Sequence, residues 1–133
     1  MGDAWLSRPE IVSATEAGVE VVVEIPADSP WFSGHFPGRP VLPGVVWLHA
    51  AAELVRGFVR RDGRPLEVAG FRNVRFLTPV EGAARATIAV GPAVGAGPGE
   101  LRLEVRIGGE QVCRGLIAVR EPGSIEWLYP AGQ

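Results

Sequence analysis

The chain has 133 residues, 47% of them hydrophobic, with 13 basic and 15 acidic residues and a formal net charge of −2. This balance predicts no nucleic-acid and no membrane partner, and the length predicts a single domain over residues 1–133. The single cysteine excludes an intrachain disulfide and a zinc site built on several thiolates, and it fits a cytoplasmic location. The N-terminus does not resemble a signal peptide, and polar residues interrupt the one long apolar stretch, 41–59, which argues against a membrane span.

Two strands are expected near the N-terminus. Residues 19–25 are rich in β-branched side chains, and residues 11–15 are predicted to pair with them across a turn at 16–18. Prolines and glycines then dominate residues 26–43, so no regular element is expected there.

A helix is expected from Gly44 to Arg60, a stretch without proline. Its apolar residues cover nearly the whole circumference, which is typical of a helix buried in the core. Arg56 and Arg60 stand near its end, where the helix dipole favours cations. Asp62-Gly63 is predicted to end it.

Four more strands are expected after the helix. They are placed at about 66–76, 83–90, 100–107 and 111–120, with Gly108-Gly109 as a tight hairpin turn. Two strands, one helix and four strands predict an α+β fold, in which an antiparallel sheet wraps around one long buried helix. Because one sheet covers only part of so apolar a helix, the sequence favours a dimer.

The segment before this helix combines a histidine with a helix start. His35 lies in a loop restricted by three prolines, and imidazole is suited to proton transfer near neutral pH. Gly44 offers a backbone N–H at the positive end of the helix, where a polarised carbonyl oxygen is stabilised. Together they could remove a proton next to a thioester carbonyl. The alternative is an ordinary surface histidine in a loop.

Residues 34–44 read Gly-His-Phe-Pro-Gly-Arg-Pro-Val-Leu-Pro-Gly and meet every fixed position of the pattern G-H-F-P-G-x-P-x-x-P-G. This pattern is similar to the active-site signature of the bacterial β-hydroxyacyl-ACP dehydratases of the FabZ and FabA type. Residues 68–82 resemble the same family, and the likeness extends from about Gly18 to Arg120. The resemblance implies a single hot-dog domain, in a compact form similar to dehydratases of polyketide or aryl-polyene pathways.

The resemblance also implies roles for the matching residues. His35 would be the base, with its ring held by the backbone carbonyl of Val41. The backbone N–H of Gly44, next to Val45, would bind the thioester oxygen. The other residues of the substrate loop are Phe36, Pro37, Gly38 and Pro43. The family uses no metal and no cofactor.

The family has a glutamate or aspartate five positions after the helix-opening glycine, supplied by the other subunit, and this chain has His49 there. Three interpretations remain open. His49 replaces the carboxylic acid; or Glu53, one turn further on the same face, does so directly, through water or by orienting His49; or dehydration is weakened or lost. A histidine satisfied within the core, beside a merely solvated Glu53, is the structural alternative.

The predicted function is dehydration of 3-hydroxyacyl thioesters to trans-2-enoyl thioesters in fatty-acid or polyketide-type biosynthesis. The substrate carrier is expected to be acyl carrier protein or CoA, with arginines such as Arg39, Arg72 and Arg75 supplying positive charge near the mouth of the site. A homodimer is expected, with a higher oligomer or a heterodimer as alternatives. Because His49 replaces the acid, the alternative function is a non-dehydrating hot-dog domain: an acyl-thioester-binding partner subunit, an isomerase or a thioesterase.

Overall fold

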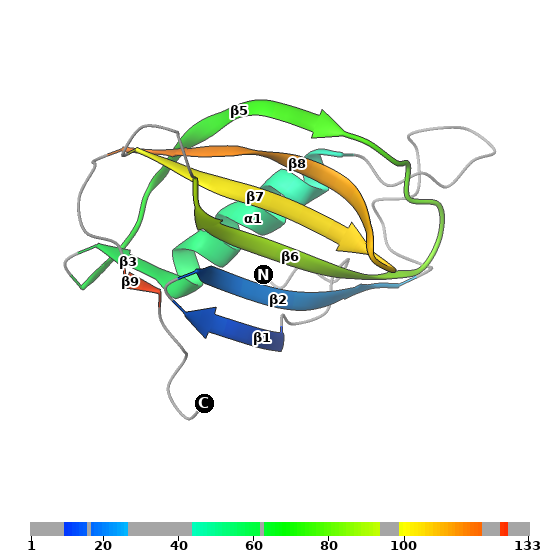
Figure 1. The fold of residues 1–133 in the computed structure, drawn as a ribbon, viewed down its shortest axis with the longest axis horizontal. Helices are drawn as coiled ribbons and strands as arrows, with labels where there is room; N and C mark the ends of the chain where they lie inside the picture. Colours follow the sequence, from blue (N-terminus) through cyan, green and yellow to red (C-terminus); the bar gives the residue numbers. More distant parts are fainter. Residues whose placement is uncertain are drawn as a thin grey trace.

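The computed structural model describes residues 10–15, 17–26, 44–61, 63–93, 99–120 and 126–127. Its main element is a six-stranded antiparallel sheet in the order β1-β2-β6-β7-β8-β5 (Figure 1). The strands are β1 (Glu10–Thr15), β2 (Gly18–Ile25), β5 (Val68–Phe76), β6 (Ala84–Pro92), β7 (Glu100–Ile107) and β8 (Glu110–Val119). These are the strands predicted from the sequence, with bounds that differ by one or two residues.

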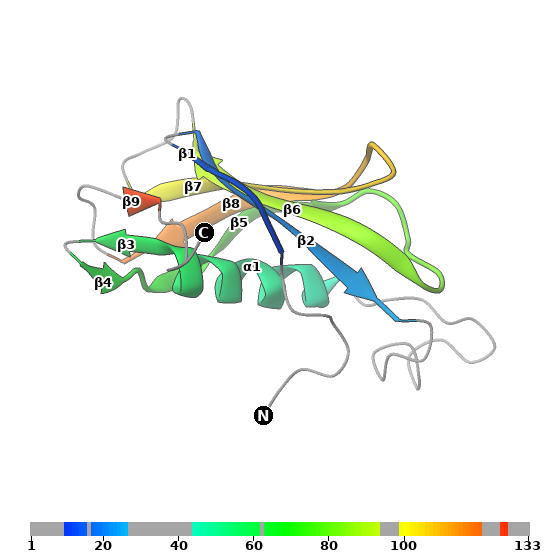
Figure 2. The same cartoon turned by 90° about the horizontal axis from the view of Figure 1, so that it is seen from below.

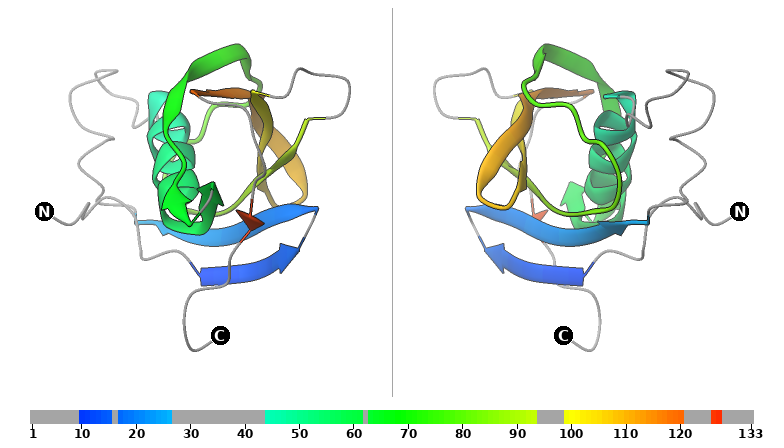
Figure 3. Two further views of the ribbon diagram at one scale, coloured as in Figure 1. Left: turned by 90° about the vertical axis from the view of Figure 1, so that its left-hand side faces the viewer. Right: turned by 90° about the vertical axis from the view of Figure 1, so that its right-hand side faces the viewer.

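The helix α1 (Val45–Phe58) lies along the concave face of this sheet, as the side view in Figure 2 and the two end-on views in Figure 3 show. Its buried residues pack against the inward-facing side chains of β2, β6, β7 and β8. The helix contributes Val46, Trp47, Ala50, Ala51, Leu54 and Val55 to this core. The predicted antiparallel sheet wrapped around one helix is therefore confirmed. No helix in the described part of the chain is long and apolar enough to cross a membrane.

The helix ends earlier than predicted. Val59 already has extended backbone angles, with φ −119° and ψ 133°, and it opens the short strand β3 (Val59–Arg61). This strand pairs with β4 (Arg64–Pro65) and β9 (Glu126–Trp127) in a second, three-stranded sheet. Because Val59 is fully buried and β-branched, packing and strand propensity favour the extended form over a further helical turn.

The hairpin between β7 and β8 turns at Gly108 and Gly109, as predicted. Their φ angles are +59° and +84°, so both central residues adopt the left-handed conformation that a two-residue type I′ turn requires. β-branched or bulky residues would be strained at either position. The two glycines therefore help to fix the register of β7 and β8, the strands that this turn joins.

Cys113 lies in the core on β8, and burial raises the pKa of its thiol from 9.0 to about 11. At pH values between these two pKa values, the unfolded chain releases the thiol proton while the folded chain keeps it. The free energy of unfolding should therefore fall with rising pH in this window, by at most about 1.4 kcal/mol per pH unit from this group. Urea unfolding of the wild type and Cys113→Ala at pH 8 and pH 10 measures this contribution, and equal pH dependence in the two proteins would contradict it.

Candidate active site

The site is built on the N-terminal end of α1. Gly44 precedes the first helical residue, and the backbone N–H of Trp47 donates to the Gly44 carbonyl over 3.0 Å. The first turn contains no acidic residue, and no described side chain caps it with a hydrogen bond. The positive end of the helix dipole is thus not neutralised by the described residues, which favours a partly negative ligand oxygen at this end.

The aromatic ring of Phe76 covers Gly44. A Cβ atom added at Gly44 would lie 2.7 Å from Cδ1 of Phe76 and 2.8 Å from Cε1. Contacts this short do not occur between ordinary side chains, so the ring and the helix start can approach only because residue 44 has no side chain. The packing therefore requires glycine at the position where the motif has it.

A β-bulge explains why Phe76 faces the helix. Arg72 lies opposite Leu116 of β8, but three residues later Arg75 lies opposite Arg114, so β5 has one extra residue in this stretch. Asn73 within the bulge has a φ of +53°. Side chains alternate between the faces of a strand, so one inserted residue moves Phe76 from the outer face to the inner face.

Two exposed apolar side chains, those of Val45 and Phe76, lie at this helix start, and a third, Leu77, follows Phe76 in the chain. Val45 is 56% exposed, Phe76 54% and Leu77 46%, and these account for three of the four exposed large hydrophobic residues in the described part of the chain. An apolar surface beside an uncapped helix end can contact the apolar part of a ligand whose polar atom faces the backbone N–H groups.

His49 and Glu53 lie on the exposed face of α1, one turn apart. The helix therefore has a buried face toward the sheet and an exposed face that carries both polar candidates, rather than being buried all round. The alternative that His49 is a core residue is wrong, because its side chain is exposed. Residues four apart on a helix are neighbours, so a ligand that contacts one can reach the other.

A hollow of about 770 Å³ continues along the second half of α1. Its walls combine Glu53 and Arg56 of the helix with Leu66, which lies between β4 and β5, and Val68 at the start of β5. Gly44, Val45 and His49 are not among its lining residues, so it starts one helical turn beyond His49. The hollow offers both apolar and charged surface, and it lies further along the same helix than the candidate site.

Six of the predicted site residues lie outside the described residues. They are His35, Phe36, Pro37, Gly38, Val41 and Pro43. The structure places the other four, Gly44, Val45, His49 and Glu53, on the first three turns of one helix. The described residues contain no group of three or more His, Cys, Asp or Glu side chains that could hold a metal ion.

The sequence does not identify Phe76 and Leu77 as candidate site residues. Both fall within the segment 68–82 that carries the family likeness, so their neighbourhood was visible in the sequence. Their position next to the helix start depends on the bulge at Asn73, and a single inserted residue leaves no periodic signal.

Comparison with known proteins decides the family. The model of the ApeI-like family, described as ApeI dehydratase, matches residues 11–115 of this chain. The chain belongs to the ApeI-like dehydratase family. The predicted FabZ-type relationship is also confirmed: the 3-hydroxyacyl-[acyl-carrier-protein] dehydratase FabZ of Thermus thermophilus is 37% identical over 81 residues. That match spans 57% of this chain and 57% of the relative, little more than half of its length.

Solved structures confirm the hot-dog fold of this ApeI-like protein. The dehydratase heterocomplex ApeI:P from Xenorhabdus doucetiae superposes with a TM-score of 0.61 at 17% identity, covering 86% of this chain and 100% of that chain. The pyran synthase domain from module nine of the sorangicin pathway gives a TM-score of 0.65 at 20% identity, covering 98% of this chain and 43% of that chain. At these identities the structures support the fold alone.

Proposed function

We propose that this protein dehydrates 3-hydroxyacyl thioesters to trans-2-enoyl thioesters in fatty-acid or polyketide-type biosynthesis. The observation that carries the proposal is the helix start at Gly44: it is uncapped by described side chains, closely covered by Phe76, and part of a complete family motif. Membership of the ApeI-like dehydratase family supports the same reaction. We also propose that residues 1–133 form one domain and act in the cytoplasm.

The reaction needs a base, an oxyanion donor and an acid. In the proposed mechanism His35 removes the C2 proton of the substrate, and the negative charge that develops on the thioester oxygen is stabilised by the Gly44 N–H. Expulsion of the C3 hydroxyl then forms the C2–C3 double bond, and a proton from the acid leaves with that hydroxyl as water. No external oxidant or reductant is required.

His49 is the proposed acid. It occupies the family's acidic position, and its exposed side chain lies on the same helix as Gly44. An imidazolium donates a proton as a carboxylic acid does, and Glu53 lies one turn away on the same helix face, at the spacing of a helical ion pair. This assignment explains why the loop motif is complete although the family's acidic position holds histidine. It requires no loss of dehydratase activity.

The assembly is proposed to be a dimer joined along β5. This strand ends the six-stranded sheet, so its outer backbone groups have no strand partner among the described residues. Such an edge is suited to pairing with another chain. A second copy is the favoured partner, and the heterocomplex formed by the related ApeI:P proteins makes a heterodimer the alternative.

The test is hydration of crotonyl or longer enoyl thioesters, offered on acyl carrier protein and on CoA and followed by loss of the conjugated thioester absorbance. The wild type is expected to turn over, and His35→Ala is expected to lower the rate by at least about 100-fold, because general base catalysis contributes that much. No turnover of either carrier by the wild type would overturn the proposal and favour a non-dehydrating acyl-thioester-binding subunit. Equal rates in wild type and His35→Ala would remove His35 from the mechanism.

A further inference from the structure

The hollow beside α1 is built from three segments of the chain that backbone hydrogen bonds join. Its walls come from the second half of α1, from residues 64–68, and from Arg120 directly after β8. The Leu66 N–H donates to the Val59 carbonyl over 3.2 Å, which joins the second wall to the end of the helix. The Arg120 N–H donates to the Glu67 carbonyl, also over 3.2 Å, which joins the third wall to the second. The backbone therefore holds the three walls in place relative to one another, as a binding site requires.

One part of the hollow is apolar. Ala52 of α1 and Val68 of β5 line it and are partly buried, and Leu66 is only 3% exposed. Together with Pro65 they form a surface that methylene groups of a ligand can cover.

The other part of the hollow is charged. Five charged side chains line it: Glu53, Arg56, Arg64, Glu67 and Arg120. Glu67 and Arg120 form an ion pair at 3.1 Å, which leaves two arginines and one glutamate, a formal charge of +1. Arg56 and Arg64 are exposed, and neither forms an ion pair with a carboxylate of the described residues. The hollow therefore favours an anionic group over a cationic or neutral one.

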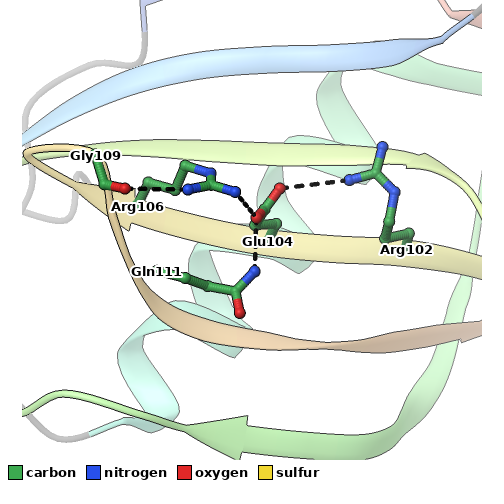
Figure 4. A network of polar contacts seen from close by, with 5 residues as sticks. All are labelled: Arg102, Glu104, Arg106, Gly109 and Gln111. Carbon is green, nitrogen blue, oxygen red and sulfur yellow. Dashed lines mark hydrogen bonds and ion pairs between the residues drawn. The ribbon is translucent and has the colours of Figure 1, made fainter.

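Arginines elsewhere on this protein have carboxylate partners within the chain. On β7 the carboxylate of Glu104 pairs with Arg106 at 2.5 Å and with Arg102 at 3.7 Å, and it accepts a hydrogen bond from Gln111 over 2.6 Å (Figure 4). These arginines are satisfied by the fold itself. The two exposed arginines of the hollow can be satisfied in the same way only by a carboxylate that the described residues do not supply.

The end of the helix does not use the charge of these two arginines. A third guanidinium, that of Arg60, donates to the carbonyl oxygens of Arg56 over 3.0 Å and of Val59 over 3.2 Å. Carbonyl groups at a helix C-terminus carry partial negative charge and disfavour a nearby anion. Because Arg60 covers them, the side chains of Arg56 and Arg64 keep their charge for a ligand.

The proposed mechanism sets the direction of an acyl chain along α1. There the Gly44 N–H faces the thioester oxygen at C1, and His49, further along the helix, acts on the hydroxyl at C3. Carbons beyond C3 continue in the same direction, toward the hollow, which starts one turn after His49. From His49 to Arg56 the helix rises by about 10 Å, so an acyl chain of about eight carbons brings its far end within reach of the arginine side chains.

We infer that the hollow binds the far end of the acyl chain and selects an end that carries a carboxylate, with Arg56 and Arg64 as specificity-determining residues. The inference rests on the proposed function for the position of the thioester. It narrows the substrate class to 3-hydroxyacyl thioesters derived from dicarboxylic acids. The methylene groups of such a chain cover the apolar wall, and the two guanidinium groups bind the terminal carboxylate, which they can do through parallel hydrogen bonds.

The test compares two chains that differ only at the far end. Hydration is measured for trans-2-octenoyl pantetheine and for its analogue with a terminal carboxylate in place of the methyl group, so that no carrier protein contributes. The wild type is expected to prefer the carboxylate-ended chain by about tenfold in kcat/KM, because each exposed ion pair contributes about threefold in binding. The preference should fall to about threefold in Arg56→Gln and in Arg64→Gln, and vanish in the double variant.

Two controls make this preference specific to the hollow. Arg85→Gln should keep the full preference, because Arg85 is also exposed but pairs with Glu24 over 2.8 Å and does not line the hollow. A carboxylate-ended chain of crotonyl length should show no preference in any variant, because it ends close to His49. Arg64→Glu should reverse the charge selectivity and favour a chain that ends in an amine.

Direct binding separates this inference from the proposed function. Octanoyl pantetheine and its carboxylate-ended analogue have no double bond to hydrate, so calorimetry measures their binding without turnover. Tighter binding of the carboxylate-ended thioester, lost in the double variant but kept in Arg85→Gln, supports the inference even if hydration is absent. Equal binding of both ends by the wild type, or a preference that the double variant retains, would overturn it. A wild type that hydrates both chains equally well would likewise overturn the inference and leave the proposed function standing.

Discussion

Gly44→Ala should lower the rate of enoyl thioester hydration by about 100-fold. The added Cβ would lie 2.7 Å from the ring of Phe76, so either the ring or the helix start has to move. Either movement displaces the backbone N–H proposed to face the thioester oxygen, and loss of one oxyanion donor costs about 100- to 1,000-fold in rate. The effect should appear mainly in kcat, because the donor acts on charge that develops during the reaction.

Two variants make this result specific. Gly57→Ala adds the same methyl group near the other end of α1, where no atom lies within 4 Å of the new Cβ, so it should leave activity unchanged and raise helix stability by about 0.5–1 kcal/mol. Adding Phe76→Ala to Gly44→Ala removes the clash and should recover part of the lost rate. Wild-type activity in Gly44→Ala would show that the contact between Gly44 and Phe76 has no part in catalysis.

The sheet and the helix were predictable because their signals are local. Strict alternation over residues 101–107 predicts the strand β7, and a long proline-free apolar stretch predicts α1. The second sheet was missed because β4 and β9 each span two residues, too few for any periodicity. The end of α1 was misplaced because Asp62-Gly63 indicates a helix end near Arg60, whereas Val59 is buried in an extended conformation and the helix ends at Phe58, two residues earlier.

The candidate site was likewise predictable only in part. The motif around Gly44 identifies the helix start from the sequence alone, because its glycines and prolines are fixed in kind and spacing. The positions of Phe76 and Arg75 could not be predicted, since one extra residue in β5 exchanges the faces that they occupy. The exposure of His49 could not be predicted either, because an apolar sequence on all sides of a helix does not show which side the sheet covers.

His49→Ala is expected to lower kcat for hydration by about 100- to 1,000-fold, which is the usual contribution of a positioned acid. The fold should survive, because His49 is exposed and substitutions at the surface usually change the free energy of unfolding by about 0.5 kcal/mol. Thermal unfolding of the same sample checks this, so a loss of rate with an unchanged melting temperature assigns His49 to the chemistry. An unchanged rate would remove it from the mechanism.

Two further substitutions distinguish the three interpretations of this position. If His49 is the working acid, His49→Glu restores the family's residue without its adapted surroundings and should be slower than the wild type, while Glu53→Gln should lower the rate by about tenfold through loss of the charge that supports the imidazolium. If Glu53 is the acid, Glu53→Gln should be as slow as a variant that lacks both His49 and Glu53. His49→Ala should then be nearly as fast as the wild type. If dehydration has been weakened by the change to histidine, His49→Glu should instead be faster than the wild type. The ranking of these three rates therefore decides which side chain on the exposed face of α1 donates the proton.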